Sequence, residues 1–369
     1  MTGRGIVNDS MQVLAGSAVV LLVLLVCVRA VRRERERRRE RAAEPLRVLL
    51  LEFLCAEGDE EAGSLRALSA LDDRSWAALE PTARAILAKV SGQARASLVA
   101  LFEQRGVATR AMADLRRRGP VRKGRAAEVL GLLRHRAATP RLRVLLSDAD
   151  SEVRTVAARA LGHIGDPADV PDLLACLHGP HPVPPAVVLQ ALTAFGAAGH
   201  DQIATGLDDA EPLVRAVTVE ALGATGGVGW TTRVAAALRA DPHLEVRIRA
   251  ARALGALGTP AGLEPLLHAV RRGQPESLRA VAARALGRLG ASCAAPRLGE
   301  LLDDPVHRVA ATAARALLHV GPAGRDELRR AADGARGGHA AAHARAALAE
   351  AAIGEKGAHS AAGRAAVGP

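Results

Sequence analysis

A small group of cysteine and histidine side chains lies close enough in the sequence to suggest chemistry. Cys176, His178 and His181 stand beside a proline-rich segment, and thiolate and imidazole groups are the ligands that zinc prefers. No second ligand cluster accompanies them, and the patterns GxxxxGKS, GxxxxGKT and HExxH are absent from the sequence. The sequence therefore predicts no catalytic residue, no metal and no cofactor.

A second pair of histidines lies near the C-terminal end. His339 and His343 are four residues apart, which places both on one face of a helix. That face carries the apolar residues of the last repeat, so we interpret the pair as part of a helical end cap.

The residues that recur at a regular spacing are arginines. If one arginine is taken as the anchor of a repeat, equivalent positions follow every 30 to 32 residues. These anchor positions are Arg66, Ser97, Glu128, Arg159, Gln190, Glu220, Arg252, Arg284, Arg315 and Arg345. A fixed spacing of this size indicates stacked supersecondary units rather than one closed core.

Each repeat has the apolar pattern of a helix. The residue two positions after every anchor is apolar, and in one copy Val153, Val156, Ala157, Ala160 and Leu161 form a stripe at helical spacing. A second amphipathic segment follows, as in residues 167–177. The pattern predicts an all-α fold, an α-solenoid of about nine to ten helical hairpins.

Glycine pairs follow the first helix of several repeats. We interpret both members of each pair as C-caps or tight turns. The pairs are Gly162 and Gly165, Gly223 and Gly226, Gly255 and Gly258, and Gly287 and Gly290.

A second basic row lies five residues before the anchor, and aspartates lie eleven residues before it. We interpret these rows as a structural ladder in which each arginine bonds an aspartate or a helix-end carbonyl of the adjoining repeat. A row of ligand-binding arginines is the alternative. The ladder residues are Asp148, Arg154, Asp209, Arg215, Asp241, Arg247, Arg279 and Asp304, with Lys123 before them.

The anchor row points about 130° away from the apolar stripe on a helical wheel. It is therefore either a solvated helix face or a docking surface for an acidic segment of a partner. The candidate partner-binding residues are Arg159, Gln190, Glu220, Arg252, Arg284 and Arg315.

At these residues the chain resembles HEAT-like repeats of the type named after phycobilisome lyases. The matching segments are residues 150–174, 241–267 and 278–302. The resemblance implies an α-solenoid with a concave binding face. The group also includes enzymes, namely bilin lyases and deoxyhypusine hydroxylases. The latter hold iron with His-Glu pairs, and this sequence has no His-Glu dipeptide.

The N-terminal region carries an apolar run. Residues 11–28 hold no charge and eleven Leu or Val residues, and as a helix they would be about 27 Å long. The sequence predicts a leader at 1–10, a single transmembrane helix at 11–31 and a basic juxtamembrane linker at 32–45 that ends at Pro45. The arginines after the run predict a single-pass cell-membrane protein with its N-terminus outside and its repeats in the cytoplasm.

The rest of the chain divides by the regularity of its repeats. The sequence predicts degenerate helical repeats at 46–139, the HEAT-like solenoid at 140–352 and a disordered tail at 353–369. The proline-rich segment 180–185 interrupts the spacing, and it serves either as a connection or as a binding loop.

Composition narrows the possible partners. The net charge is +11, but arginines outnumber lysines 47 to 3, and there are only three Phe, two Trp and no Tyr. Readers of single-stranded nucleic acid stack bases on aromatic rings, so nucleic acid is an unlikely partner. The sequence predicts a membrane-tethered scaffold that binds another protein, such as a membrane enzyme or an acidic segment. A bilin-lyase-like enzyme or chaperone and binding of a nucleic-acid backbone are the alternatives.

Overall fold

The computed structural model describes residues 22, 24–27, 29, 44–56, 58–334 and 338–365, with side chains described as far as residue 353. All regular secondary structure in this described part is helical. The chain divides into two compact units, residues 1–113 and 114–369.

The first unit contains α2 (Asp59–Ser69), α3 (Asp73–Leu87) and α4 (Gly92–Gln104), preceded by helical residues 44–55. Its core includes Trp76 and Phe102, whose rings meet edge to face with centroids 5.5 Å apart. The guanidinium carbon of Arg105 lies 4.9 Å from the centroid of the Trp76 ring. This cation–π contact joins the end of α4 to α3. The short helix α5 (Val107–Asp114) spans the boundary of the two units.

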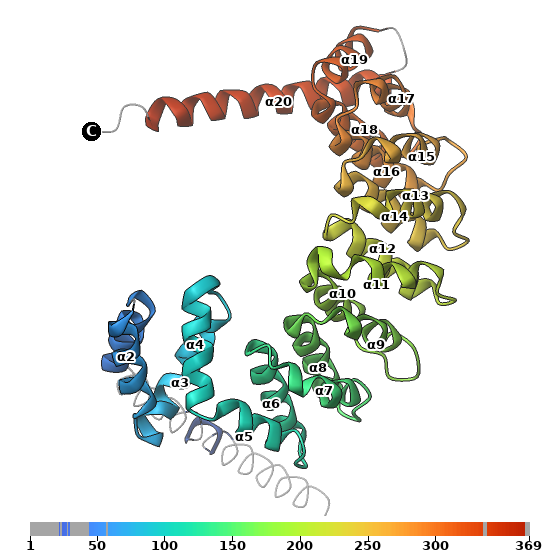
Figure 1. The fold of residues 1–369 in the computed structure, drawn as a ribbon. Coiled ribbons are helices and arrows are strands. Elements are labelled where there is room, and N and C mark those ends of the chain that lie inside the picture. The colour runs from blue at the N-terminus through green and yellow to red at the C-terminus, as the bar shows by residue number, and fades with distance from the viewer. Residues whose placement is uncertain are drawn as a thin grey trace, which may run out of the picture. The chain divides into compact units, whose positions relative to one another are not determined.

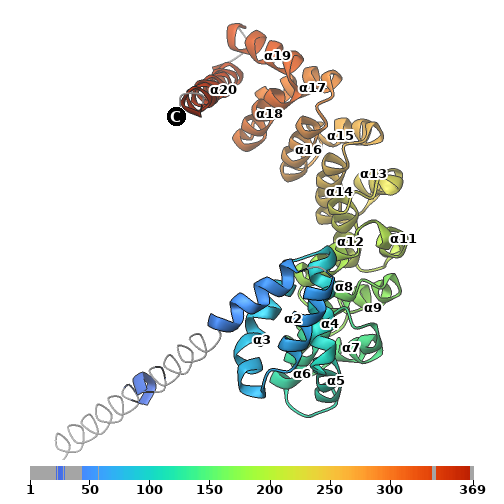
Figure 2. The same cartoon turned by 60° about the vertical axis from the view of Figure 1, so that its left-hand side comes forward.

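The second unit is a stack of helices in two layers (Figures 1 and 2). The inner layer lies on the concave side of the curve and consists of α6 (Pro120–Leu132), α8 (Ser151–Ile164), α10 (Pro185–Ala194), α12 (Pro212–Ala224), α14 (Leu244–Leu257), α16 (Glu276–Leu289) and α18 (His307–Val320). The outer layer consists of α7 (Thr139–Leu145), α9 (Val170–Ala175), α11 (His200–Ala204), α13 (Thr231–Ala240), α15 (Leu263–Ala269) and α17 (Ala295–Glu300). The chain alternates between the layers, as stacked helical hairpins require.

Short 3-10 helices connect the layers. Those before outer helices are η1 (Arg136–Ala138), η2 (Pro167–Asp169), η3 (Gly196–Gly199), η5 (Val228–Trp230), η6 (Pro260–Gly262) and η7 (Ser292–Ala294). Two others, η4 (Thr205–Asp208) and η8 (Leu301–Asp303), follow outer helices. The stack continues with α19 (Pro322–Asp333) and α20 (Gly338–Ala365), and α20 packs against α18.

The repeat period predicted the helical register. All ten anchor positions lie in even-numbered helices, from Arg66 in α2 to Arg345 in α20. The apolar residue two positions after the anchor is buried in each of these helices except α4, where Val99 is half-buried. The predicted all-helical solenoid is therefore confirmed.

The first glycine of each pair is not a cap, contrary to the prediction. Gly255 lies inside α14, and a Cβ added to it would stand 2.7 Å from the Cα of Ala285 on the next inner helix. Gly131, Gly162, Gly223 and Gly287 meet an alanine of the next repeat in the same way. Only the absence of a side chain lets neighbouring inner helices approach this closely. The second glycine can be a true cap, as at Gly258, which ends α14 with a φ of 66°.

The regular stack begins earlier than predicted. The predicted change from degenerate to regular repeats is at residue 140, whereas the second compact unit begins at residue 114. Helix α6 already packs on α8 through the contact of Gly131 with Ala160. The packing of one inner helix on the next is therefore already regular at α6, although the loops before residue 140 do not follow the repeat pattern.

The tail also differs from the prediction. Residues 353–365 were expected to be disordered, but α20 continues to Ala365. Alanine has the highest helix propensity, and this segment is rich in alanine.

The predicted membrane location is contradicted. Within the described residues, no helix combines the length and apolar composition needed to cross a membrane. Most of the segment predicted as the anchor, residues 11–31, lies outside the described residues, as do nearly all of residues 1–10 and 32–45.

Candidate partner-binding groove

The anchor row is a solvent-facing row on the inner layer of the second unit. Each of the inner helices from α8 to α18 contributes one residue of this row. Arg159, Gln190, Arg252, Arg284 and Arg315 are exposed, and Glu220 is half-buried. The structure thus places all six candidate binding residues on the same side of consecutive helices.

Arginines surround two adjoining cavities at the C-terminal end of this row. The cavity between α16 and α18 has a volume of about 290 Å³ and is lined by Arg284, Arg288, Thr312, Arg315, Ala316 and His319. The cavity between α14 and α16 has a volume of about 210 Å³ and is lined by Arg252, Val281, Arg284, Ala285 and Arg288. We call these two cavities together the arginine groove. Arg284 and Arg288 line both cavities, so an elongated anionic ligand could contact the two at once.

Carboxylates are scarce near the arginine groove. Among the described residues, Arg284, Arg288 and Arg315 make no ion pair. Arg252 lies 3.5 Å from Glu220, which is also paired with Arg249 at 2.6 Å. Of the anchor arginines that line the groove, Arg252 therefore has a carboxylate partner, whereas Arg284 and Arg315 have none among the described residues.

Two side chains of the arginine groove that carry nitrogen groups were not among the predicted binding residues. Arg288 and His319 stand one helical turn after the anchors Arg284 and Arg315. The signal was the row four residues after the anchor, which reads His163, Ala194, Ala224, Ala256, Arg288 and His319. Small side chains occupy its middle, and Arg288 is its only member with a formal charge at pH 7.

The N-terminal part of the inner layer has a different character. A cavity of about 170 Å³ between α8 and α10 includes Arg159, His163 and Gln190 in its lining. Another of about 320 Å³, between α6 and α8, is lined mostly by apolar and acidic residues, among them Val121 and Glu152. The inner layer therefore changes from acidic and apolar at one end to strongly basic at the other.

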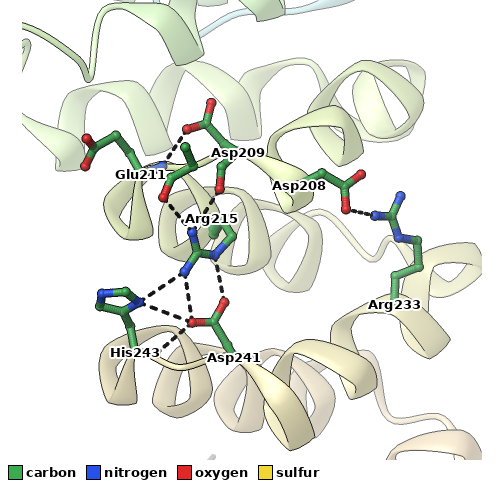
Figure 3. A network of polar contacts seen from close by, with 8 residues as sticks. Asp208, Asp209, Glu211, Arg215, Arg233, Asp241 and His243 are labelled. Atoms are coloured by element: carbon green, nitrogen blue, oxygen red, sulfur yellow. Dashed lines mark hydrogen bonds and ion pairs between the residues drawn. The ribbon is translucent and has the colours of Figure 1, made fainter.

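The second basic row lies between the repeats. Figure 3 shows Arg215, whose Nε donates to Oδ2 of Asp241 at 2.7 Å and whose Nη2 donates to Oδ1 at 3.0 Å. Its Nη1 donates to the backbone carbonyl oxygens of Asp209 and Ala210. One guanidinium therefore binds the loop of its own repeat and the aspartate of the next.

The same arrangement recurs along the stack. Arg279 donates from Nε and Nη2 to Asp304, both at 2.9 Å. Lys123 Nζ lies 2.6 Å from Asp148. Arg247 bonds the side-chain oxygen of Gln274 instead of a carboxylate.

The ladder is interrupted at the proline-rich segment. Arg154 donates to the backbone carbonyls of Asp148 and Ala149, and its buried Nε has no hydrogen-bond partner. The next repeat would supply an aspartate about 25 residues later, where Gly179 and Pro180 stand. Asp209, one repeat further on, lies 3.4 Å from His178.

These contacts change the titration of the aspartates. Burial raises the pKa of Asp241, but the hydrogen bonds from Arg215 and from the backbone of His243 outweigh burial and hold it below its usual value. At Asp148, burial likewise raises the pKa, but the hydrogen bonds from Lys123 and from the backbone of Asp150 outweigh burial and lower it. Both carboxyl groups therefore favour the charged form in the fold.

The cysteine and histidine cluster has no metal-binding geometry. Burial raises the pKa of Cys176 to about 12, and its Sγ lies 2.9 Å from the carbonyl oxygen of Leu173. His178 is directed to Asp209. No group of three or more Cys, His, Asp or Glu side chains in the described part of the chain could hold a metal ion.

Of the two C-terminal histidines, His343 belongs to the contact of α20 with α18, and His339 is exposed. The ring of His343 packs against that of His307 with centroids 4.7 Å apart. Burial lowers the pKa of His343, and the neighbouring His307 and His339 lower it further. The neutral imidazole is therefore the form that packs here.

Comparisons with known protein families identify these repeats. The HEAT-repeat family model matches residues 115–196 and 200–281, and the model of PBS lyase HEAT-like repeats matches residues 278–304. No curated protein matches the chain.

Several solved structures are similar to the chain. The CpcE–CpcF complex of phycocyanin lyase from Nostoc sp. shares 24% identity over 66% of this chain and 94% of that one, with a TM-score of 0.32. Human deoxyhypusine hydroxylase shares 21% identity over 70% of this chain and 96% of that one, with a TM-score of 0.31. The karyopherin Kap121p bound to the SUMO protease Ulp1p shares 15% identity over 77% of this chain and 38% of that one, with a TM-score of 0.48.

The matched residues cover the two-layered stack from α6 to α17, including the arginine ladder and most of the arginine groove. The chain is a HEAT-repeat protein.

Proposed function

We propose that the chain is a scaffold that binds an acidic segment of another protein in the arginine groove. The single observation that carries this proposal is the group of three arginines, Arg284, Arg288 and Arg315, around one cavity without an acidic partner among the described residues. A guanidinium presents a planar set of donors that suits carboxylates, so an acidic side chain would be bound by paired hydrogen bonds.

The arginines of the ladder and those of the groove differ in whether they already have partners within the protein. The arginines of the ladder already bond aspartates or carbonyl oxygens of the protein. Arg284, Arg288 and Arg315 of the groove are exposed on helices of the inner layer, and no ion pair in the described part of the chain occupies their donors. A partner segment lying along the inner layer would contact several repeats at once.

The experiment is a fluorescence anisotropy titration of the full chain with a labelled glutamate-rich peptide. The double variant Arg284→Gln, Arg315→Gln should bind at least about tenfold more weakly, because each lost charge-assisted hydrogen bond contributes about 1.5–3 kcal/mol. The matched control is Arg239→Gln, Arg271→Gln, which removes the same charge from exposed positions in and after outer helices. Equal affinity of the native chain and the groove variant would contradict the proposal.

Two further measurements test the alternative functions, bilin binding and nucleic-acid binding, that the sequence left open. Binding of a bilin would shift the absorption of the pigment on addition of the chain. Binding of duplex DNA would weaken steeply with salt, because phosphate contacts release counterions.

A further inference from the structure

The cavity between α16 and α18 concentrates more positive charge than one carboxylate can neutralise. Three guanidinium groups, those of Arg284, Arg288 and Arg315, share a cavity of about 290 Å³. Among the described residues no acidic side chain lines this cavity or the adjoining one. Like charges around one cavity repel each other, and a ligand of higher negative charge relieves that repulsion best.

His319 adds a directed nitrogen to this cavity. Its Nδ1 lies 2.8 Å from the carbonyl oxygen of Arg315. Because a carbonyl oxygen only accepts hydrogen bonds, Nδ1 carries a proton, and Nε2 of the singly protonated ring is a hydrogen-bond acceptor. The cavity therefore offers three guanidinium forks that donate hydrogen bonds and one imidazole nitrogen that accepts one.

A phosphoryl group fits the donors of the three guanidinium groups, and the hydroxyl of its monoanionic form can donate to Nε2 of His319. A phosphorylated serine or threonine carries a charge of about −1.5 to −2 and three strong acceptor oxygens, whereas a carboxylate carries about −1 and two oxygens. Arginine clusters are a recurring means of recognising phosphorylated side chains.

The adjoining cavity indicates which side chain of the ligand lies next to the phosphoryl group. It is centred on Arg252, Arg284 and Arg288, one inner helix away from the first cavity. Packed helices lie about 8–10 Å apart, a distance that about three residues of an extended chain cover. A second acidic side chain about three residues from the phosphorylated one would therefore reach the second cavity.

We propose that the arginine groove recognises a phosphorylated serine or threonine of a partner protein, with a second acidic residue about three positions away. This proposal rests on the proposed function, because it names the chemistry of the acidic segment. No Trp or Phe lines either cavity, which favours a peptide over a single-stranded nucleic acid whose bases would need stacking partners.

The test uses the full chain and three labelled peptides of glycine, serine and glutamate. In each peptide one glutamate stands three residues from a variable position that holds serine, phosphoserine or glutamate. We expect the phosphoserine peptide to bind about tenfold more tightly than the glutamate peptide. Arg315→Gln should abolish that preference, because Arg315 lines only the first cavity.

Arg252→Gln and Arg239→Gln are the comparison variants. Arg252 lines only the second cavity, so its loss should weaken the phosphoserine and glutamate peptides by the same factor. Arg239 is exposed on α13 in the outer layer, and its loss should leave both affinities unchanged. Thermal unfolding of each variant shows whether the fold is retained.

Each result decides between the two proposals. Equal affinity for phosphoserine and glutamate, lost in Arg315→Gln, would overturn the phosphate inference and leave the acidic-segment function intact. A phosphoserine preference that persists in Arg315→Gln would overturn the site. Failure of every peptide to bind would overturn both proposals. Duplex DNA that displaces the phosphoserine peptide and binds more tightly, with the same arginine dependence, would replace the protein partner with nucleic acid.

Discussion

The arginines of this chain divide into two kinds by what surrounds them. Arg279 is buried between two repeats and bonds both oxygens of Asp304, whose side chain is fully buried. Arg308 also pairs with a carboxylate, that of Glu276 at 3.4 Å, but both side chains are more than half exposed. Burial removes water from the first pair, so loss of one partner leaves a charge without solvent or counter-ion.

This difference predicts the stability of two variants. Arg279→Gln should destabilise the chain by about 3–5 kcal/mol because Asp304 remains buried without its partner. The matched variant Arg308→Gln should cost about 0–1 kcal/mol, as exposed pairs do. Thermal unfolding followed by circular dichroism measures both. Similar midpoints for the two variants would show that the ladder does not hold the repeats together.

The ladder could be predicted from residue types and spacing, but the contacts at its gap could not. Asp148 and Asp241 carry opposite charge to Lys123 and Arg215 and recur at a fixed distance from them, so the sequence indicated the pairs. At the gap, Gly179 and Pro180 stand where the aspartate would be, but the sequence did not indicate that the buried Nε of Arg154 has no hydrogen-bond partner. Arg288 was missed for a related reason, since it joins Arg315 only across neighbouring helices.

At the scale of helices, the close approach of successive inner helices depends on glycine facing alanine. A Cβ on Gly287 would stand 2.8 Å from the Cα of Ala316. The sequence analysis assigned this glycine to a cap because glycine is common there. Position in the chain cannot separate the two uses, since both fall in the last turns of the helix, and only the packing of the next helix distinguishes them.

We predict that Gly287→Ala destabilises the chain by about 1–3 kcal/mol, because the added methyl group must displace the backbone of α18. Gly124→Ala in α6 is the matched control. Nothing lies within 4 Å of its added Cβ, so alanine there should stabilise the helix by up to about 1 kcal/mol. Urea or thermal unfolding distinguishes them. If both substitutions changed the free energy of unfolding in the same direction, the proposed role of the glycine row would be wrong.

The contact of α20 with α18 should depend on pH. The pKa of His343 is lowered in the fold below its ordinary value of 6.5. The neutral form is thus favoured, so the contact is fully stable above pH of about 6.5 and weakens as the pH falls through that value toward the lowered pKa. Hydrogen exchange in the first turns of α20 should accelerate over that range. His343→Leu should remove the pH dependence, whereas His181→Gln, at an exposed position, should retain it. Exchange that is independent of pH in the native chain, after correction for intrinsic rates, would contradict this account.

At the scale of the whole chain, charge is distributed unevenly along the inner layer of the second unit. Glu128, Asp150 and Glu152 line the cavity near α6, and Arg252, Arg284, Arg288 and Arg315 line the cavities near α16. The net charge of +11 therefore describes the chain poorly, because the charge that a partner meets depends on the repeat. The sequence predicted the layers and the row, since both follow from the period. The cavities arise from pairs of helices and could not be read from one repeat.

The central claim is that a partner binds the inner layer through the arginine groove, and arginine footprinting tests it most directly. The full chain is treated with phenylglyoxal with and without the glutamate-rich peptide, and modified arginines are identified by mass spectrometry. We predict that Arg284, Arg288 and Arg315 are protected by the peptide, while Arg239 and Arg271 are modified to the same extent in both samples. Protection of Arg239 and Arg271 with unchanged modification of Arg284, Arg288 and Arg315 would contradict the account.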